Sequence, residues 1–145
     1  MGEVVDFKVH MTAQRFKKIL HAEDDPDIRE IARMSLEMIG GFEILQCASG
    51  EEVLKAANDF APDMFLMDVM MPGMDGRESV RQLRQSANFA ETPVVFVTAK
   101  ASNVDVDQLK EEFEAAVITK PFDPITLPDQ LKEIWSRMTP EPAGS

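Results

Sequence analysis

One carboxylate, Asp68, interrupts an apolar run in the stretch FLMDVMMPGMDG, residues 65–76. Burying a charge without a partner is costly, so a carboxylate in a segment this apolar indicates a function or a nearby cation. Other apolar runs end in residue types that could accompany it: Glu23 and Asp24 after KILHA (18–22), Thr98 in PVVFVTA (93–99), and Lys120 at the end of AAVITK (115–120).

These residue types predict a phosphoryl-transfer chemistry. Converging carboxylates repel one another unless a cation lies among them, and hard oxygen ligands with room for water favour Mg²⁺. Lys120 would add a second positive charge, and the hydroxyl of Thr98 would donate to a phosphate oxygen. An ionised and fixed Asp68 could then act as a nucleophile on phosphorus and form an aspartyl phosphate. Positioning and electrostatics supply most of the catalysis in such transfers.

The elements that must position these residues alternate along the chain. Short apolar runs, typical of strands covered on both faces of a parallel sheet, occur at 18–22, 42–48, 63–69, 93–99 and 115–120. Segments with helical spacing separate them, and the first predicts one apolar stripe made of Ile28, Ile31, Ala32, Leu36 and Ile39. Strict alternation predicts a doubly wound α/β fold, (βα)5, with functional residues at the carboxyl ends of the strands.

Composition and charge narrow the function classes. The 145 residues favour one domain, and we expect a flexible leader or cloning remnant at 1–14, the folded domain at 15–138 and a flexible tail at 139–145. Fifteen Lys and Arg against 26 Asp and Glu give a net charge of −11, which argues against a nucleic-acid surface. The single cysteine, Cys47, allows no internal disulfide, and the apolar runs are too short to span a membrane.

Four motifs together give the chain a family resemblance. They are HAEDDP (21–26), MDVMMPGMDG (67–76), VTAK (97–100) and TKPFDP (119–124). In this order, and at these strand ends, they resemble the response-regulator receiver domain of two-component signalling, of the single-domain type found in chemotaxis regulators. The resemblance covers roughly residues 16–138. It implies a flavodoxin-like fold with a five-stranded parallel sheet and five helices.

The resemblance also implies a role for each matching residue. Asp68 would be the phosphoacceptor, with Thr98 and Lys120 as its catalytic partners and Thr98, Ala99 and Lys120 binding the phosphoryl group. The Mg²⁺ ligands, with Mn²⁺ as a substitute, would be Glu23 (partly through water), Asp24, Asp68 and the backbone carbonyl of Met70. The switch region would comprise Thr98 and Val117, and the Lys120–Pro121 bond would be cis.

The sequence departs from the family pattern in three places. Val117 stands where an aromatic residue usually moves with the switch hydroxyl, which favours a signal carried by the loop at 99–105 instead. Phe113-Glu114 replaces a common Gly-Ala pair, so we expect the fourth helix to end differently. His21 occupies a strand position that is normally aliphatic, and we predict a core histidine with one hydrogen-bonded nitrogen.

Partners follow from the same resemblance. The phosphoryl donor would be a sensor histidine kinase or a histidine phosphotransfer protein. The chain would be a signalling phosphoacceptor that promotes its own phosphorylation and dephosphorylation, not an enzyme. Its output would be contact with a target protein through the fourth helix, fifth strand and fifth helix, in the cytoplasm. We expect no direct contact with nucleic acid or membrane, and a monomer or a phosphorylation-dependent dimer.

Four alternatives are open at this point. The chain could be a receiver module of a hybrid kinase or larger regulator. A haloacid-dehalogenase-type phosphatase would need a second Asp two positions after Asp68, where Met70 stands. A flavodoxin-like cofactor carrier would need a hydroxyl- or Gly-rich loop where EDDP (23–26) stands. A degenerate receiver would no longer accept phosphate, which the retention of all the active-site side chains opposes.

Overall fold

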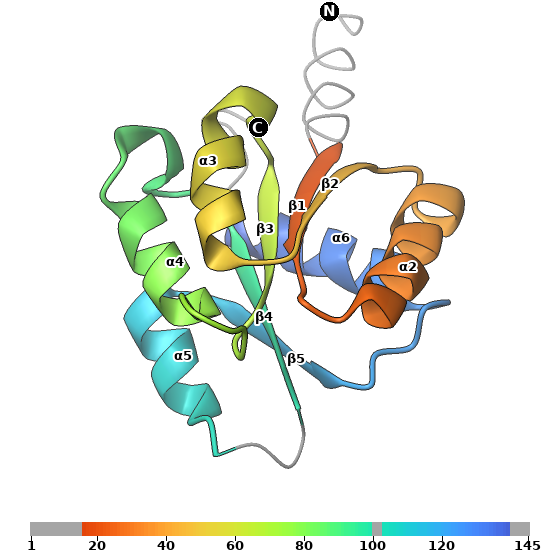
Figure 1. Cartoon of the computed structure of the whole chain (residues 1–145). Helices are drawn as coiled ribbons and strands as arrows, with labels where there is room; N and C mark the ends of the chain where they lie inside the picture. Colours follow the sequence, from red (N-terminus) through yellow and green to blue (C-terminus); the bar gives the residue numbers. More distant parts are fainter. Residues whose placement is uncertain (1–15, 100–102, 140–145) are drawn as a thin grey trace, which may run out of the picture.

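Five parallel strands form one sheet in the part of the chain that the computed structural model describes, residues 16–99 and 103–139. The order across the sheet is β2-β1-β3-β4-β5 (Figure 1). The strands are β1 (Lys18–Ala22), β2 (Glu43–Cys47), β3 (Met64–Asp68), β4 (Val94–Ala99) and β5 (Ala116–Lys120). Each lies within the apolar run that predicted it, so the doubly wound fold is confirmed.

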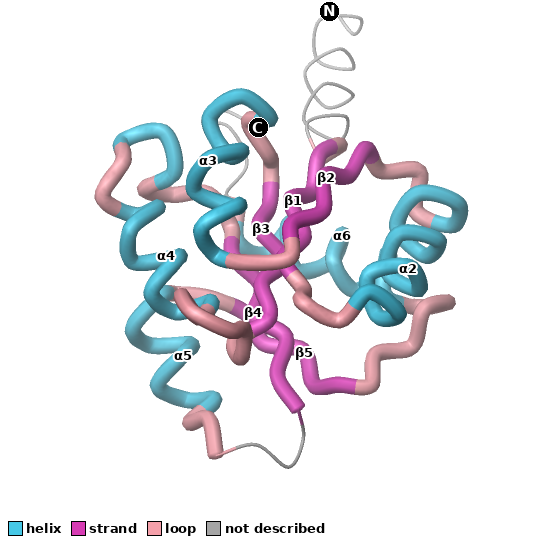
Figure 2. The backbone as a smooth tube through the Cα atoms, in the orientation of Figure 1, coloured by secondary structure: helices cyan, strands magenta, loops and turns pink. Residues whose placement is uncertain are grey.

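Helices cover both faces of the sheet, which gives three layers (Figure 2). Within the described residues the α-helices are α2 (Pro26–Met34), α3 (Gly50–Phe60), α4 (Gly76–Arg84), α5 (Val106–Phe113) and α6 (Leu127–Met138). A π-helical segment, η1 (Ser35–Ile39), continues α2, and a short 3-10 helix, η2 (Ala87–Phe89), follows α4. The core has two parts: α3, α4 and α5 pack on one face, and η1 and α6 on the other. None of the described helices combines the length and apolarity needed to cross a membrane.

The helices begin where local chemistry predicts. Asp25 caps α2 by accepting hydrogen bonds from the N–H groups of Asp27 and Ile28, and Pro26 fits the first turn because it has no N–H to satisfy. Ser49 caps α3 by accepting from the N–H of Glu52, whose own carboxylate reaches back to the N–H of Ala48. These caps fix the loops after β1 and β2 at the edge that carries the site.

The predicted stripe of the first helix is partly wrong. Ala32 and Leu36 are fully buried, but Ile31 is 47% exposed and Ile39 is 52% exposed. Ala32 is the one buried residue of α2, so the buried side of this helix is narrower than the predicted apolar stripe and leaves Ile31 exposed. At Ser35–Ile39 the helix becomes π-helical, with the N–H of Gly40 bonded to the carbonyl of Ser35. The wider turn changes the direction of the residues after it, so a spacing of 3.6 no longer describes one face.

Strand order explains why the carboxyl edge can hold a site. From β1 the chain crosses to one outer edge at β2, and from there it returns past β1 to β3, β4 and β5. The crossovers on the two sides of β1 therefore leave in opposite directions, and their loops diverge between the carboxyl ends of β1 and β3. Glu23 follows β1, and Asp68 is the last residue of β3.

Candidate functional site

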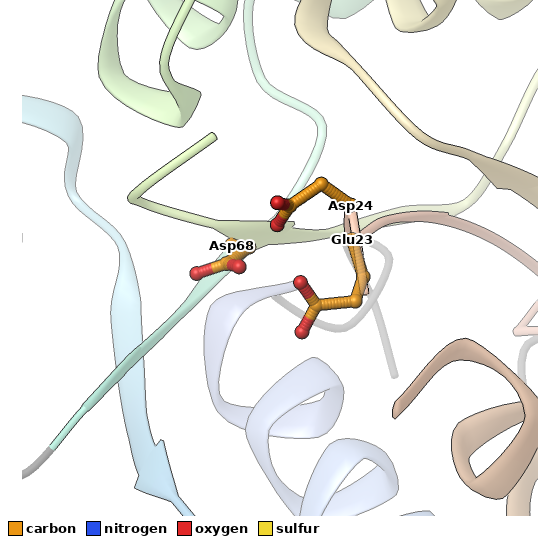
Figure 3. A group of neighbouring side chains, drawn as sticks. All are labelled: Glu23, Asp24 and Asp68. Carbon is orange, nitrogen blue, oxygen red and sulfur yellow. The ribbon is translucent and has the colours of Figure 1, made fainter. Parts of the chain in front are cut away.

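An acidic pair follows β1 at this edge. The side chain of Glu23 is buried, whereas Asp24 is exposed. Oxygen atoms of Glu23, Asp24 and Asp68 all lie within 4.8 Å of one another, and Figure 3 shows the three carboxylates gathered at the ends of their two strands. Burial, followed by the neighbouring Asp68 carboxyl, raises the pKa of Glu23, and partial burial together with Glu23 raises the pKa of Asp24.

Asp68 is held in a crowded position. It is 5% exposed and lies opposite Val97 in the register of β3 with β4. The loop after β3 turns through Gly73, whose φ is +75°, and returns so that the N–H of Gly76 donates to the carbonyl of Val69 at 2.9 Å. A Cβ on Gly76 would come within 2.2 Å of the backbone oxygen of Asp68. The glycines of the motif therefore allow the loop to fold back over the strand end that carries Asp68.

Lys120 connects two of the carboxylates. Its Nζ donates to Glu23 Oε1 at 2.6 Å and to Asp68 Oδ2 at 3.0 Å. Burial opposes the ammonium charge, but the hydrogen bonds that Lys120 donates to these two carboxylates outweigh it and raise the pKa of Lys120. The structure thus brings together the predicted residues Glu23, Asp24, Asp68 and Lys120. The Lys120–Pro121 peptide bond is cis, as predicted.

The other predicted residues lie at or near the same edge. Thr98 is 2% exposed near the end of β4, and Ala99, the last residue of that strand, pairs in register with Lys120. Met70 lies two residues after Asp68 and is 61% exposed. The loop at 99–105 includes residues 100–102, which lie outside the described residues.

Val117 lies away from the acidic cluster, three residues before Lys120 on β5. It lines a groove of about 300 Å³ between α5, β5 and α6. Glu114, which replaces the usual small residue after the fourth helix, caps α5 in a left-handed conformation with φ at 51°. The left-handed backbone at this residue is one that glycine commonly adopts at the end of a helix, so the expectation that this helix ends differently stays a prediction.

The donor set fits a hard divalent cation. Carboxylate oxygens from Glu23, Asp24 and Asp68 are the ligand type that Mg²⁺ and Mn²⁺ prefer, and the exposure of Asp24 leaves one side open to water. No histidine or cysteine belongs to this cluster among the described residues. The arrangement can hold a metal, bring a lysine to the same carboxylate, and present one oxygen of Asp68 to a phosphoryl group.

Sequence reasoning missed two residues behind the acidic pair. Arg29 donates from Nη1 to the backbone carbonyls of Glu23 at 2.8 Å and Asp24 at 3.0 Å. Gln46 lies opposite His21 in the register of β1 with β2 and hydrogen-bonds to its Nδ1 at 3.1 Å. His21 is 3% exposed, so the prediction of a core histidine with a bonded nitrogen is confirmed. The sequence shows His21 and Gln46 as polar residues within apolar runs, but only the register of β1 with β2 places them opposite each other.

Comparison with known proteins places this geometry in a family. Residues 19–132 match the response regulator receiver domain. The phosphate regulon transcriptional regulatory protein PhoB of Pseudomonas aeruginosa is 34% identical over 124 residues, which cover 86% of this chain and 54% of that protein. The alkaline phosphatase synthesis transcriptional regulatory protein PhoP of Bacillus subtilis is 35% identical over 121 residues, covering 83% of this chain and 49% of that protein. The chain spans about half the length of the curated relatives it matches.

Solved structures agree with the sequence relatives. The chemotaxis protein CheY4 of Vibrio cholerae superposes with a TM-score of 0.74 at 28% identity, over 82% of this chain and 98% of that one. The signal receiver domain of a histidine kinase from Syntrophus aciditrophicus gives 0.73 at 28% identity, over 89% of this chain and 97% of that one. Both the fold and the motifs at its strand ends are thus accounted for, and the chain belongs to the response regulator receiver domain family of two-component signalling.

Proposed function

We propose that Asp68 is the residue that accepts the phosphoryl group, and that the donor is a phosphohistidine of a sensor histidine kinase or a histidine phosphotransfer protein. One observation carries the proposal. The carboxylate of Asp68 ends a buried strand, accepts a hydrogen bond from Lys120 at 3.0 Å, and lies with Glu23 and Asp24 in one oxygen cluster. Family membership supports the same reaction.

In this reaction a carboxylate oxygen of Asp68 attacks phosphorus while the bond from phosphorus to the imidazole nitrogen of the donor breaks, and the electron pair of that bond stays on the nitrogen. The ammonium of Lys120 donates to one phosphoryl oxygen, and the hydroxyl of Thr98 and the N–H of Ala99 donate to others. Bound Mg²⁺ or Mn²⁺ would neutralise charge on the phosphoryl oxygens. Its ligands would be Asp24, Asp68, the Met70 carbonyl and, through water, Glu23.

Hydrolysis reverses the modification. Water attacks the phosphorus of the aspartyl phosphate while the bond from phosphorus to the Asp68 oxygen breaks, so inorganic phosphate leaves, a proton is released to solvent, and the Asp68 carboxylate is restored. The same side chains hold the phosphoryl oxygens during transfer to Asp68 and during hydrolysis, so the chain promotes its own phosphorylation and dephosphorylation. We therefore regard it as a signalling phosphoacceptor, not as an enzyme with a substrate of its own.

A surface of this chain that suits the donor protein lies beside the site. Ile31, Met34 and Met38, which follow one another along α2 and η1, are 47%, 49% and 77% exposed. Ile125, 66% exposed, lies in the segment after β5, which is joined to this helix by the hydrogen bond from Ser35 Oγ to the carbonyl of Pro124. Figure 1 shows that segment running beside α2. An apolar helical surface of the phosphohistidine protein would cover these side chains while its imidazole reaches Asp68.

The output surface would lie on the opposite side of the site, on α5, β5 and α6. The lining of the groove there includes the apolar residues Ala116, Val117 and Ile134 and the charged residues Lys110 and Arg137. After phosphorylation, this face would contact either a target protein, with the chain as a monomer, or a second copy of the chain in a dimer. The negative net charge of −11 favours protein targets over nucleic acid.

A module of a larger protein would use the same site. The curated relatives are about twice as long as their matched region, and one structural relative is the receiver of a histidine kinase. Phosphoryl transfer to Asp68 in the cytoplasm would then be read by a neighbouring domain in place of a separate target. The chemistry at the strand ends is identical in both cases.

Labelling with a small phosphodonor tests the acceptor. Wild-type protein should take up label only with a divalent cation present, and the label should map to the peptide that contains Asp68. Asp68→Asn keeps the shape of the side chain but removes the nucleophilic oxygen, so uptake should be lost. Asp59→Asn, at an exposed position on α3, is the matched control and should label normally. Equal labelling of the Asp68→Asn protein on the same peptide would show that another residue accepts the phosphoryl group.

Thermal unfolding tests the metal. Because Mg²⁺ binds only the native carboxylate cluster, it should raise the melting temperature relative to chelator. Asp24→Ala should abolish this effect and raise the stability of the metal-free protein, because one repelling charge is gone. Asp27→Ala removes a carboxylate from the first turn of the adjacent helix and should leave the Mg²⁺ effect intact. Identical melting temperatures of the wild type with Mg²⁺ and with chelator would contradict the site.

A further inference from the structure

Arg29 is hydrogen-bonded through its side chain, its backbone N–H and its backbone carbonyl. Its N–H donates to the carbonyl of Asp25 at 3.0 Å, the first hydrogen bond of α2. Its guanidinium donates from Nη1 to the carbonyls of Glu23 and Asp24, at 2.8 and 3.0 Å. Its own carbonyl accepts from Gln46 Nε2 at 2.8 Å. One side chain and its backbone therefore connect the start of α2 to both residues of the acidic pair.

The anchor of this arrangement lies in the sheet. The amide of Gln46 donates one hydrogen to the carbonyl of Arg29 and the other toward Nδ1 of His21, which leaves the proton of the neutral imidazole on Nε2. His21 and Gln46 are partners in the register of β1 with β2, and the N–H of Glu23 donates to the carbonyl of Cys47 at 3.0 Å. The acidic pair is thus tied to β2 directly and, through Arg29, a second time.

We propose that Arg29, anchored by Gln46 and His21, is a positioning residue that fixes the backbone of Glu23 and Asp24 and thereby sets the affinity of the site for its divalent cation. The proposal rests on the metal site proposed above. Holding two successive carbonyls restricts the backbone dihedrals between them, and these dihedrals set the directions in which the two carboxylates point. Groups that orient metal ligands commonly change metal affinity 10- to 100-fold.

The two cations near the cluster differ in what they contact. Lys120 donates to carboxylate oxygens of Glu23 and Asp68, two of the groups that would hold the metal directly or through water. Arg29 places its positive charge beside Glu23 and Asp24 but contacts only their backbone oxygens, so it occupies none of the carboxylate oxygens. Arg29 can therefore relieve part of the repulsion among the acids without competing for the ligand atoms.

This difference gives opposite predictions for the removal of Arg29. If Arg29 acted only as a nearby positive charge, a neutral replacement would tighten cation binding, because less repulsion would oppose the incoming ion. If Arg29 positions the ligands, the same replacement weakens binding. A role confined to holding the fold together would lower stability without changing the dissociation constant measured on folded protein.

The experiment measures Mn²⁺ binding by the electron paramagnetic resonance signal of the free ion, on the full chain. Arg29→Gln should weaken Mn²⁺ binding about tenfold. Arg33→Gln is the matched control, since Arg33 lies one turn further on the same helix, is 43% exposed and pairs only with Glu30 and Glu37 among the described residues. This control should bind Mn²⁺ within about twofold of wild type. Fluorescence of Trp135 confirms that each variant is folded.

Each result is decisive. Weaker binding by Arg29→Gln, with Arg33→Gln unchanged, supports positioning, and unchanged or tighter binding by Arg29→Gln overturns it. If Arg29→Gln does not fold, Gln46→Leu takes its place, because it keeps every charge and removes only the anchor: weakened binding supports the proposal and wild-type binding overturns it. Failure of the wild type to bind Mn²⁺ would instead contradict the metal site of the proposed function.

Discussion

Replacing Lys120 by Met should destabilise the metal-free protein by about 3 kcal/mol. The side chains of Glu23 and Asp68 are only 2% and 7% exposed, and both bond to the Lys120 ammonium, at 2.6 and 3.0 Å. At an effective dielectric constant of about 20, each pair attracts by about 6 kcal/mol before desolvation is counted. Removing one partner of a buried ion pair costs about 3 to 5 kcal/mol. We expect the lower value because Lys120 itself is 21% exposed, so water can reach the site.

Mg²⁺ should recover more stability in this variant than in the wild type. Without Lys120, the carboxylate oxygens have no competing donor, and the metal replaces the lost positive charge. If the substitution tightens Mg²⁺ binding about tenfold, the extra stabilisation at saturating Mg²⁺ is about 1.4 kcal/mol.

Urea unfolding followed by Trp135 fluorescence, with Mg²⁺ and with chelator, measures both effects. Lys55→Met, at an exposed position on α3, is the control for loss of a lysine. The reasoning fails if Lys120→Met is no more destabilising than Lys55→Met, or if Mg²⁺ stabilises wild type and variant equally.

Three further predictions follow from other elements. Burial lowers the pKa of His21 from 6.5 to about 3, so only the unfolded chain is protonated between these values and stability falls as the pH drops through this window. By linkage the loss reaches about 2 kcal/mol at pH 5, and urea unfolding of His21→Leu against pH should show a flatter profile; an unchanged profile would contradict the assignment. Ala61 ends α3 in the left-handed region, with φ at 53°. Because a Cβ is unfavourable there, Ala61→Gly should stabilise the folded protein by about 1 kcal/mol in the same urea assay. A loss of stability would contradict this prediction. Hydrogen exchange with and without a phosphoryl mimic should change mainly between Thr98 and residue 113, because Val117 cannot reproduce a moving ring; changes confined to 115–120 would restore β5 as the moving part.

Much of the fold and the acidic cluster could be predicted from the chain alone. Apolar runs of strand length, separated by helical spacing, allow few arrangements other than a parallel sheet covered on both sides. Parallel strands all end at the same edge, so Glu23, Asp68 and Lys120 had to lie near one another once the strands were placed. The caps at Asp25 and Ser49 could also be predicted, because they depend only on neighbouring residues.

Other features depended on the order and register of the strands, which local patterns do not contain. Lys120 bonds to Glu23, 97 residues away, because β1 and β5 run parallel in one sheet, with β3 and β4 between them, and both end at its carboxyl edge. His21 meets Gln46 because β1 and β2 align at those positions. Ile31 and Ile39 are exposed because the buried side of α2 is narrow and η1 changes the helical period. Sequence by itself thus determined which chemistry gathers at one edge of the sheet. Only the tertiary structure decided which groups touch there, since contact depends on distances of a few ångströms between segments far apart in the chain.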